Sequence, residues 1–287
     1  MLASEVESGK ISADGRQREF LVSTPGSAGP HPAVVVLHGG TLNAQNAMRT
    51  TGFEPLVERE GLLAVYPSAI AGHWNDGRRS AHWSSNSGDD VAFIRALVAE
   101  LVRTGVADAH RIYVTGPSNG GMMTLRLVCE AAELFAAAAP IIASMPADLA
   151  PRCRPARPLP VLVMNATADP LVPYGGGSVG LRGERGGVLS TGDTIAFLRK
   201  VNGCSAESKT DRLPDADPAD GSDVAVISWT DCSSRAPVLL YRIDGAGHRI
   251  PRRNEAPRQV VDRLLGPANH DFEAAEAIWS FFRDKRR

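Results

Sequence analysis

The chain has 287 residues, 43% of them hydrophobic, and a formal net charge of −1 at pH 7. A chain of this length and hydrophobic content can bury a large core, so we expect one globular domain over residues 1–287. The balanced charge argues against a nucleic-acid-binding protein and against docking on an acidic membrane surface. No apolar stretch is long enough to predict a membrane span.

Predicted strands and helices alternate along the first part of the sequence. An edge strand is expected around residues 19–23, and a first buried strand over residues 33–37. A helix is expected over residues 53–60 and the next buried strand over residues 62–67. In residues 89–103, apolar side chains recur at three- and four-residue spacings after acidic residues, which predicts an amphipathic helix.

The same alternation continues to the end of the chain. Strands are expected around residues 111–115, 137–142, 161–165, 224–230 and 238–243, and helices after residue 118, around 195–201 and over 272–282. This order predicts an α/β fold with a mostly parallel, doubly wound sheet, whose active-site loops lie at the carboxyl ends of the strands. Glycine-, proline- and aspartate-rich stretches at 175–187 and 213–221 are predicted surface loops.

The most informative segment is the turn between the strand at 111–115 and the helix that follows it. It reads Gly116-Pro117-Ser118-Asn119-Gly120, a G-x-S-x-G pattern. Such a pattern occurs by chance in many chains and could be a purely structural turn. Between a strand and a helix, however, it is typical of a nucleophile elbow, whose strained turn exposes the serine hydroxyl above the sheet. We therefore expect Ser118 to be a catalytic nucleophile.

A serine nucleophile needs a base and an acid that orients the base. Of seven histidines, His248 follows a predicted strand through a loop with two glycines, which favours it over a solvated loop histidine. Asp169 lies in the short polar loop after the strand at 161–165 and is the expected acid. The chain order Ser118, Asp169, His248 is that of α/β-hydrolases, unlike the orders of chymotrypsin and subtilisin.

An oxyanion intermediate also needs two hydrogen-bond donors. The strand at 33–37 ends in His38-Gly39-Gly40-Thr41, where a glycine-rich turn allows a backbone N–H to approach a substrate oxygen. We expect the N–H of Gly40 to be one donor, with that of Thr41 left open, and the N–H of Asn119 to be the other. His38 is expected to brace this loop by hydrogen bonds rather than to transfer protons.

Several motifs, in order through nearly the whole chain, resemble the LpqC-type polyhydroxybutyrate depolymerase and feruloyl esterase family of α/β-hydrolases. They are Leu37-His38-Gly39-Gly40, Trp74-Asn75-Asp76-Gly77, Asp89-Asp90-Val91-Ala92-Phe93-Ile94, Gly116-Pro117-Ser118-Asn119-Gly120-Gly121, Ala168-Asp169-Pro170-Leu171-Val172-Pro173-Tyr174, Gly247-His248 and Ala277-Ile278-Trp279-Ser280-Phe281-Phe282. The resemblance implies the α/β-hydrolase fold over residues 1–287 as one catalytic domain. It assigns the family's triad to Ser118, Asp169 and His248.

The sequence departs from the family pattern at three positions. Pro117 replaces a flexible apolar residue and stiffens the elbow, and Asn165 replaces a histidine at the end of its strand. Ile250 stands where the family often has a tryptophan just after the catalytic histidine. In the family, that tryptophan would help to line the acyl or polymer site.

Four cysteines allow three pairings, and none has zinc-site spacing. Local sequence position and the family resemblance favour Cys129–Cys153 and Cys204–Cys232, with buried free thiols as the alternative. Disulfides imply an oxidising compartment. Residues 1–7 lack the features of a signal peptide, which is compatible with a cytosolic protein or with a mature domain. Since the expected disulfides favour the second alternative, we expect a secreted or periplasmic protein whose signal has been removed.

Two aromatic segments could shape the substrate site. Trp74 and Trp83 lie in a polar, loop-rich stretch, where exposed tryptophans often contact sugar rings, aromatic acids or polymers. Trp74 is the expected substrate contact, together with Thr41, and packing as a loop anchor is the alternative. Trp83 is left open. His73 and His82 show no partner pattern for a metal.

Together these features predict a serine carboxylic-ester hydrolase that uses no metal and no cofactor. The expected substrates are short-chain, hydroxy-acid or hydroxycinnamoyl esters, as small molecules or polymers. Alternatives on the same fold are a serine peptidase of the prolyl-oligopeptidase type, an acyltransferase and a non-catalytic binding protein. A peptidase of that type would need a gating domain, and a binding protein would have a broken triad.

Overall fold

A single ten-stranded sheet forms the centre of the protein in the computed structural model, which describes residues 5–79, 88–181, 185–253 and 259–287. In spatial order its strands are β1 (Glu5–Ala13), β2 (Arg16–Thr24), β4 (Leu63–Pro67), β3 (His31–Val36), β5 (Ala107–Pro117), β6 (Ala137–Ile141), β7 (Val161–Ala166), β12 (Val238–Asp244), β11 (Asp223–Trp229) and β10 (Lys209–Arg212). The six strands from β4 to β12 pair in parallel, and the two strands at either edge are antiparallel. The expected mostly parallel α/β-hydrolase sheet is confirmed.

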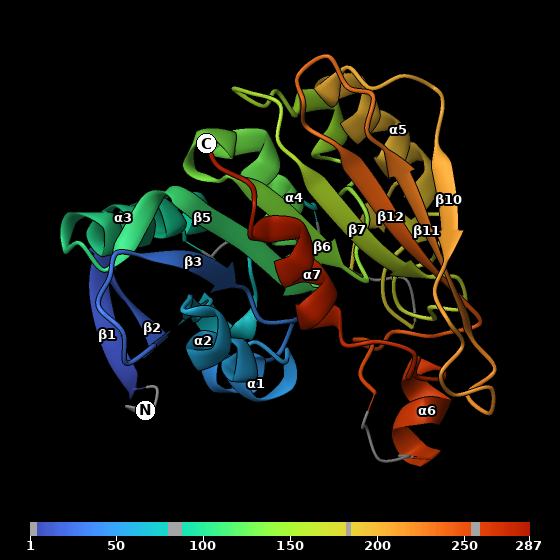
Figure 1. The fold of residues 1–287 in the computed structure, drawn as a ribbon, viewed down its shortest axis with the longest axis horizontal. Coiled ribbons are helices and arrows are strands. Elements are labelled where there is room, and N and C mark those ends of the chain that lie inside the picture. Colours follow the sequence, from blue (N-terminus) through green and yellow to red (C-terminus); the bar gives the residue numbers. More distant parts are fainter. Residues whose placement is uncertain (1–4, 80–87, 182–184, 254–258) are drawn as a thin grey trace.

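Helices cover both faces of this sheet (Figure 1). They are α1 (Ala44–Thr50), α2 (Glu54–Glu60), α3 (Asp90–Arg103), α4 (Asn119–Glu130), α5 (Thr191–Asn202) and α7 (Ala274–Phe282), and a further helix is α6 (Gln259–Leu265). Alternate residues of β3 divide between two cores, because successive side chains of a strand point to opposite faces. Val35 belongs to the core that also includes residues of α3, α4 and α5, and Val34 belongs to the core that includes residues of α1, α2 and α7. No helix in the described ranges is long and apolar enough to cross a membrane.

Some elements differ from the sequence expectations. β1 was not expected, and β10 lies in a region without a predicted strand; both are largely exposed, polar edge strands without apolar alternation. A short hairpin of β8 (Gly177–Ser178) and β9 (Gly187–Val188) lies within the predicted loop. The helices α1 and α6 were also missed, and α6 lies apart from the sheet (Figure 1).

The parallel order brings the predicted site together. β3, β5, β7 and β12 end just before Leu37, Ser118, Thr167 and Gly245, and within this part of the sheet only β6 separates β5 from β7. Since parallel strands have their carboxyl ends at one edge, the loops that carry the predicted catalytic residues share that edge.

Two disulfides link the ends of helices α4 and α5 to segments that follow them in the chain. Cys129 at the end of α4 pairs with Cys153, and Cys204 after α5 pairs with Cys232 before β12. This is the pairing that we expected, and no cysteine is left free. The bridges span 24 and 28 residues along the chain, so each restricts a loop of intermediate length in the unfolded state.

Mass spectrometry of the unreduced protein should therefore find no alkylatable thiol and two linked peptides, Cys129–Cys153 and Cys204–Cys232. Breaking either bridge should lower the free energy of unfolding by about 3 kcal/mol in the chain-entropy account, measurable by denaturant titration of Cys→Ser pairs. Four reactive thiols in the native protein would contradict the pairing and the oxidising compartment inferred from it.

Candidate active site

Ser118 lies at the apex of a strained turn between β5 and α4. Its backbone has φ 56° and ψ −120°, a region that non-glycine residues enter only when the surroundings enforce it. The surroundings here are a close backbone crossing: a Cβ at Gly116 or Gly120 would lie 2.5 Å from the carbonyl oxygen of Leu37. The elbow predicted from G-x-S-x-G is therefore present, and its glycines are required by contact with the end of β3.

His248 and Asp169 form a buried, hydrogen-bonded pair. The Nδ1 atom of His248 lies 2.7 Å from Oδ2 of Asp169. The other carboxylate oxygen accepts backbone N–H groups from Leu171 and Val172, each at 2.8 Å, so the carboxyl group is fixed at both oxygens. An ionised carboxylate only accepts, which places the imidazole proton on Nδ1 and leaves Nε2 able to accept one.

Ser118 and His248 line one cavity of about 660 Å³. Gly40, Thr41 and Asn119 line it as well, so the loops after β3, β5 and β12 converge there as expected. Ser118 Oγ makes no direct hydrogen bond to His248 in the structure. Catalytic hydrogen bonds are often long before a substrate binds and tighten in the Michaelis complex.

The two amides considered for the oxyanion site differ in their hydrogen bonding. Thr41 has φ 66°, and its N–H donates to the carbonyl of Gly72 at 2.8 Å. Gly40 N–H has no backbone acceptor among the described turns and loops. Asn119 is the first residue of α4, where an N–H has no acceptor within the helix. Gly40 and Asn119 therefore retain available donors beside Ser118.

His38 braces the loop, as the sequence suggested. Its Nδ1 lies 2.7 Å from the carbonyl oxygen of Gly39, and its Nε2 accepts the N–H of Ala69 at 3.0 Å. Burial lowers the pKa of His38 from 6.5 to about 4, outweighing the opposing effect of the Gly39 hydrogen bond. A neutral imidazole whose two nitrogens both make hydrogen bonds holds a loop in place and is not available to transfer protons.

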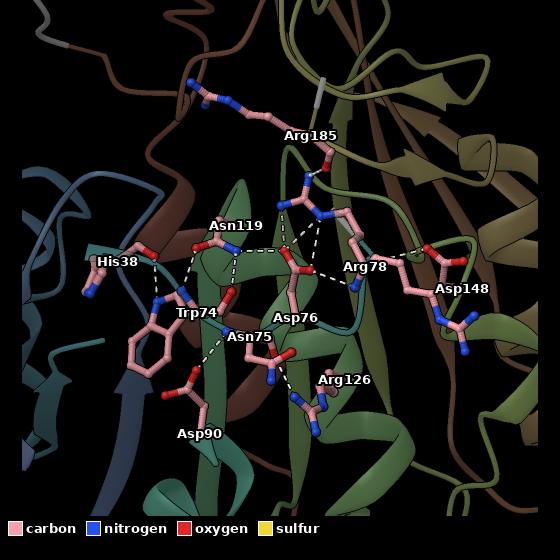
Figure 2. Close-up of polar contacts among 11 residues, drawn as sticks. His38, Trp74, Asn75, Asp76, Arg78, Asp90, Asn119, Arg126, Asp148 and Arg185 are labelled. Carbon is pink, nitrogen blue, oxygen red and sulfur yellow. Dashed lines mark hydrogen bonds and ion pairs between the residues drawn. The ribbon is translucent and has the colours of Figure 1, made fainter. Parts of the chain in front are cut away.

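Trp74 does not reach the cavity, so its expected contact with substrate is wrong. The residue is 2% exposed, and its indole Nε1 donates to the carbonyl of His38 at 2.9 Å. Its backbone N–H donates to Oδ1 of Asn119 at 2.8 Å (Figure 2). Trp74 is thus a loop anchor, the alternative left open by the sequence. Trp83 and His82 lie outside the described residues.

A buried polar network beside Ser118 was not predicted from the sequence. Figure 2 shows Asn119 between Trp74 on one side and Asp76 with Arg78 on the other. Asn119 Nδ2 donates to Oδ2 of Asp76 at 2.7 Å, and the Arg78 guanidinium lies 2.6 Å from the same oxygen. The side chains of Asp76 and Arg78 are each 4% exposed. The motif containing Asp76 was noted from the sequence, but a pairing with Asn119 across 43 residues left no local signal.

The structure shows what surrounds the three residues that depart from the family pattern. Asn165 is buried; its side chain donates to Thr191 Oγ1 at 2.9 Å and accepts the backbone N–H of Ala143 at 2.9 Å, so it joins the start of α5 to the loop after β6. Pro117 and Ile250 both line the cavity.

One group of side chains in the described part of the chain could offer three metal ligands. Asp217, Asp220 and His270 have candidate ligand atoms within 4.8 Å of one another. His270 Nδ1 already lies 3.1 Å from Asp217, and Asp220 accepts the hydroxyl of Ser222 at 2.6 Å. None of the three lines the cavity that contains Ser118.

Comparisons with known proteins agree with this architecture. The family described as Esterase PHB depolymerase matches residues 20–193. A putative esterase, NocK, of Nocardia uniformis subsp. tsuyamanensis is 28% identical over 276 residues, covering 91% of this chain and 79% of that protein. Feruloyl esterase B of Piromyces equi is 31% identical, covering 56% of this chain but only 29% of that protein.

A solved structure also shares the fold. The acetyl xylan esterase from Aspergillus awamori superposes with a TM-score of 0.59 at 17% identity, covering 85% of this chain and 94% of that one. At this identity the likeness bears on the fold alone. Since the family match spans more than half of the chain, the protein belongs to the esterase PHB depolymerase family and is a carboxylic ester hydrolase with the α/β-hydrolase fold.

Proposed function

We propose that the protein cleaves its ester through a covalent acyl-enzyme on Ser118, with His248 as general base and Asp169 as the residue that orients it. The observation that carries this proposal is the 2.7 Å Asp169–His248 hydrogen bond at the wall of the cavity that Ser118 lines. A nucleophile, a base and an orienting acid are the three parts that an activated serine needs. Treating residues 1–287 as one catalytic domain remains a prediction.

The reaction proceeds in two halves. His248 Nε2 accepts the Ser118 hydroxyl proton as Oγ bonds to the ester carbonyl carbon, and the resulting oxyanion is held by the N–H groups of Gly40 and Asn119. The acyl C–O bond to the alcohol breaks, and His248 returns its proton to the leaving oxygen. Water then attacks the acyl-enzyme with the same base, releasing the carboxylic acid and restoring Ser118. No step requires a metal or a cofactor.

The buried network supports the oxyanion donors. Asn119 is held through its side chain by Trp74 and Asp76, so its backbone N–H has little freedom to turn away from the cavity. The indole of Trp74 in turn holds the His38 carbonyl, two residues before Gly40. Preorganised donors stabilise developing charge without reorganising during the reaction, which is the main source of oxyanion-hole catalysis.

For substrate, we propose short-chain acyl, hydroxy-acid and hydroxycinnamoyl esters. Apolar side chains line part of the cavity, among them Leu42, Met122 and Leu171, and its volume of about 660 Å³ lies in the range of small-molecule sites. Named relatives include feruloyl and acetylxylan esterases. The disulfides favour an oxidising location, secreted or periplasmic.

Replacing Ser118 by alanine should reduce kcat for p-nitrophenyl acetate by roughly 10³-fold or more, because it removes the nucleophile and little else. Circular dichroism and thermal unfolding should match the parent protein, which separates loss of chemistry from loss of fold. Activity within about tenfold of the parent would reject Ser118 as the nucleophile.

Asp169→Asn should lower kcat by up to about 10⁴-fold while His248→Ala is about as damaging as the serine change. In Asp169→Asn the amide oxygen can keep the Leu171 and Val172 bonds, so the amide NH₂ would face Nδ1 and force the imidazole into the wrong tautomer. If replacing Asp148 or Asp193 abolished activity while replacing Asp169 did not, the assignment of Asp169 as the orienting acid would be wrong.

A further inference from the structure

The cavity carries an unusual concentration of positive charge. Five arginines line it, and no aspartate or glutamate does so among the described residues. They are Arg49, Arg78, Arg185, Arg249 and Arg252. The chain as a whole has a formal charge of −1, so this local excess is not a consequence of general basicity. None of the steps proposed for ester hydrolysis uses these arginines.

Two of the arginines are neutralised by buried or half-buried carboxylates. Arg78 pairs with Asp76 at 2.6 Å, and Arg249 pairs with Asp262 at 2.5 Å. Arg49 and Arg252, in contrast, have no carboxylate partner within the described ranges of the chain. The guanidinium of Arg252 donates to the carbonyl oxygen of Thr50, the last residue of α1, at 3.5 Å, which places it next to the residue that follows Arg49.

Burial and the nearby positive charges both disfavour the protonated form of His73. His73 lines the cavity and has its pKa lowered from 6.5 to about 4. Burial is the largest cause, and the positive charges of Arg185 and Arg78 add to it. An uncharged imidazole beside these arginines is consistent with a cavity that disfavours any further cation.

The position of Arg252 indicates which end of an ester would meet this charge. Arg252 is four residues after His248, on the loop that continues from the catalytic histidine. His248 must face the leaving oxygen, since it returns the proton to that atom. The alcohol half of the ester therefore extends along the loop of His248, toward Arg252 and the neighbouring Arg49.

We propose that Arg49 and Arg252 bind a free carboxylate on the leaving alcohol, so that the preferred substrates are acyl esters of hydroxy acids. This inference rests on the proposed function, because it takes its orientation from the role of His248. An arginine guanidinium matches a carboxylate in shape and charge and donates two parallel hydrogen bonds to it. Cleavage then releases the acyl group as a carboxylic acid and the alcohol as a hydroxy-carboxylate.

A matched pair of substrates tests the inference directly. In 3-acetoxybutyrate and 3-acetoxybutyramide the acyl group and the scissile bond are the same, and only the charge on the alcohol half differs. Both form the same acetyl-enzyme, so a difference in kcat/KM for acetate release reports binding of the alcohol half during acylation. We expect the anion to be preferred by about tenfold or more, with the preference shrinking as salt screens the charges.

The arginine variants assign the preference to its source. Arg49→Gln and Arg252→Gln should each lower the anion-to-amide ratio of kcat/KM, and the double variant should bring it close to one. Arg252→Lys, which retains the charge, should restore part of the ratio. Arg103→Gln is the matched control, because Arg103 is exposed at the end of α3 and pairs with Glu100; its ratio should equal that of the parent.

Three results of these measurements would overturn different parts of the proposals. A parent ratio near one, with p-nitrophenyl acetate still hydrolysed through Ser118, overturns the carboxylate inference and leaves the proposed function intact. A high ratio that survives in the double glutamine variant overturns the assignment to Arg49 and Arg252. Failure to cleave any of the three esters overturns the proposed function and the inference with it.

Discussion

The close crossing of the chain after β3 and β5 is the constraint on which the site depends. The carbonyl oxygen of Leu37 lies where side chains at Gly116 and Gly120 would otherwise be, so the two loops touch backbone to backbone. That contact holds Ser118 at a positive φ and brings the turn with Gly40 beside the start of α4. The proposed nucleophile and the proposed oxyanion donors are consequently positioned by the same feature, and neither can shift without the other.

A buried polar network adjoins this backbone contact. The Asp76–Arg78 pair and Asn119 are buried together, and breaking a buried ion pair by removing one partner typically costs about 3–5 kcal/mol. The segment around Trp74 is therefore firmly tied to the first residue of α4. Asp90 extends the tie to α3, since it accepts the N–H of Asn75 at 2.7 Å and pairs with Arg18 at 2.6 Å. Rigid support of this kind suits a catalytic geometry that must be held closely.

The sequence predicted what local patterns encode and missed what depends on contacts between distant segments. The parallel sheet, the elbow at Ser118 and both disulfides were predicted, because periodicity, turn chemistry and family motifs are local or ordered along the chain. The edge strands β1 and β10 were not, since exposed polar strands carry no apolar alternation. Trp74 was misassigned because a loop motif does not reveal whether its indole points to solvent or into the core. The arginines of the cavity come from five separate positions and converge only in the folded chain.

The central claim is that Ser118 is a nucleophile activated by His248, and the most direct measurement is covalent labelling with a fluorophosphonate followed by peptide mapping. An activated serine displaces fluoride and retains the phosphonyl group on Oγ. We predict one adduct per chain, on the peptide that contains Ser118, with labelling slowed strongly in His248→Ala. An unlabelled native protein, or an adduct mapped to another residue, would contradict the account.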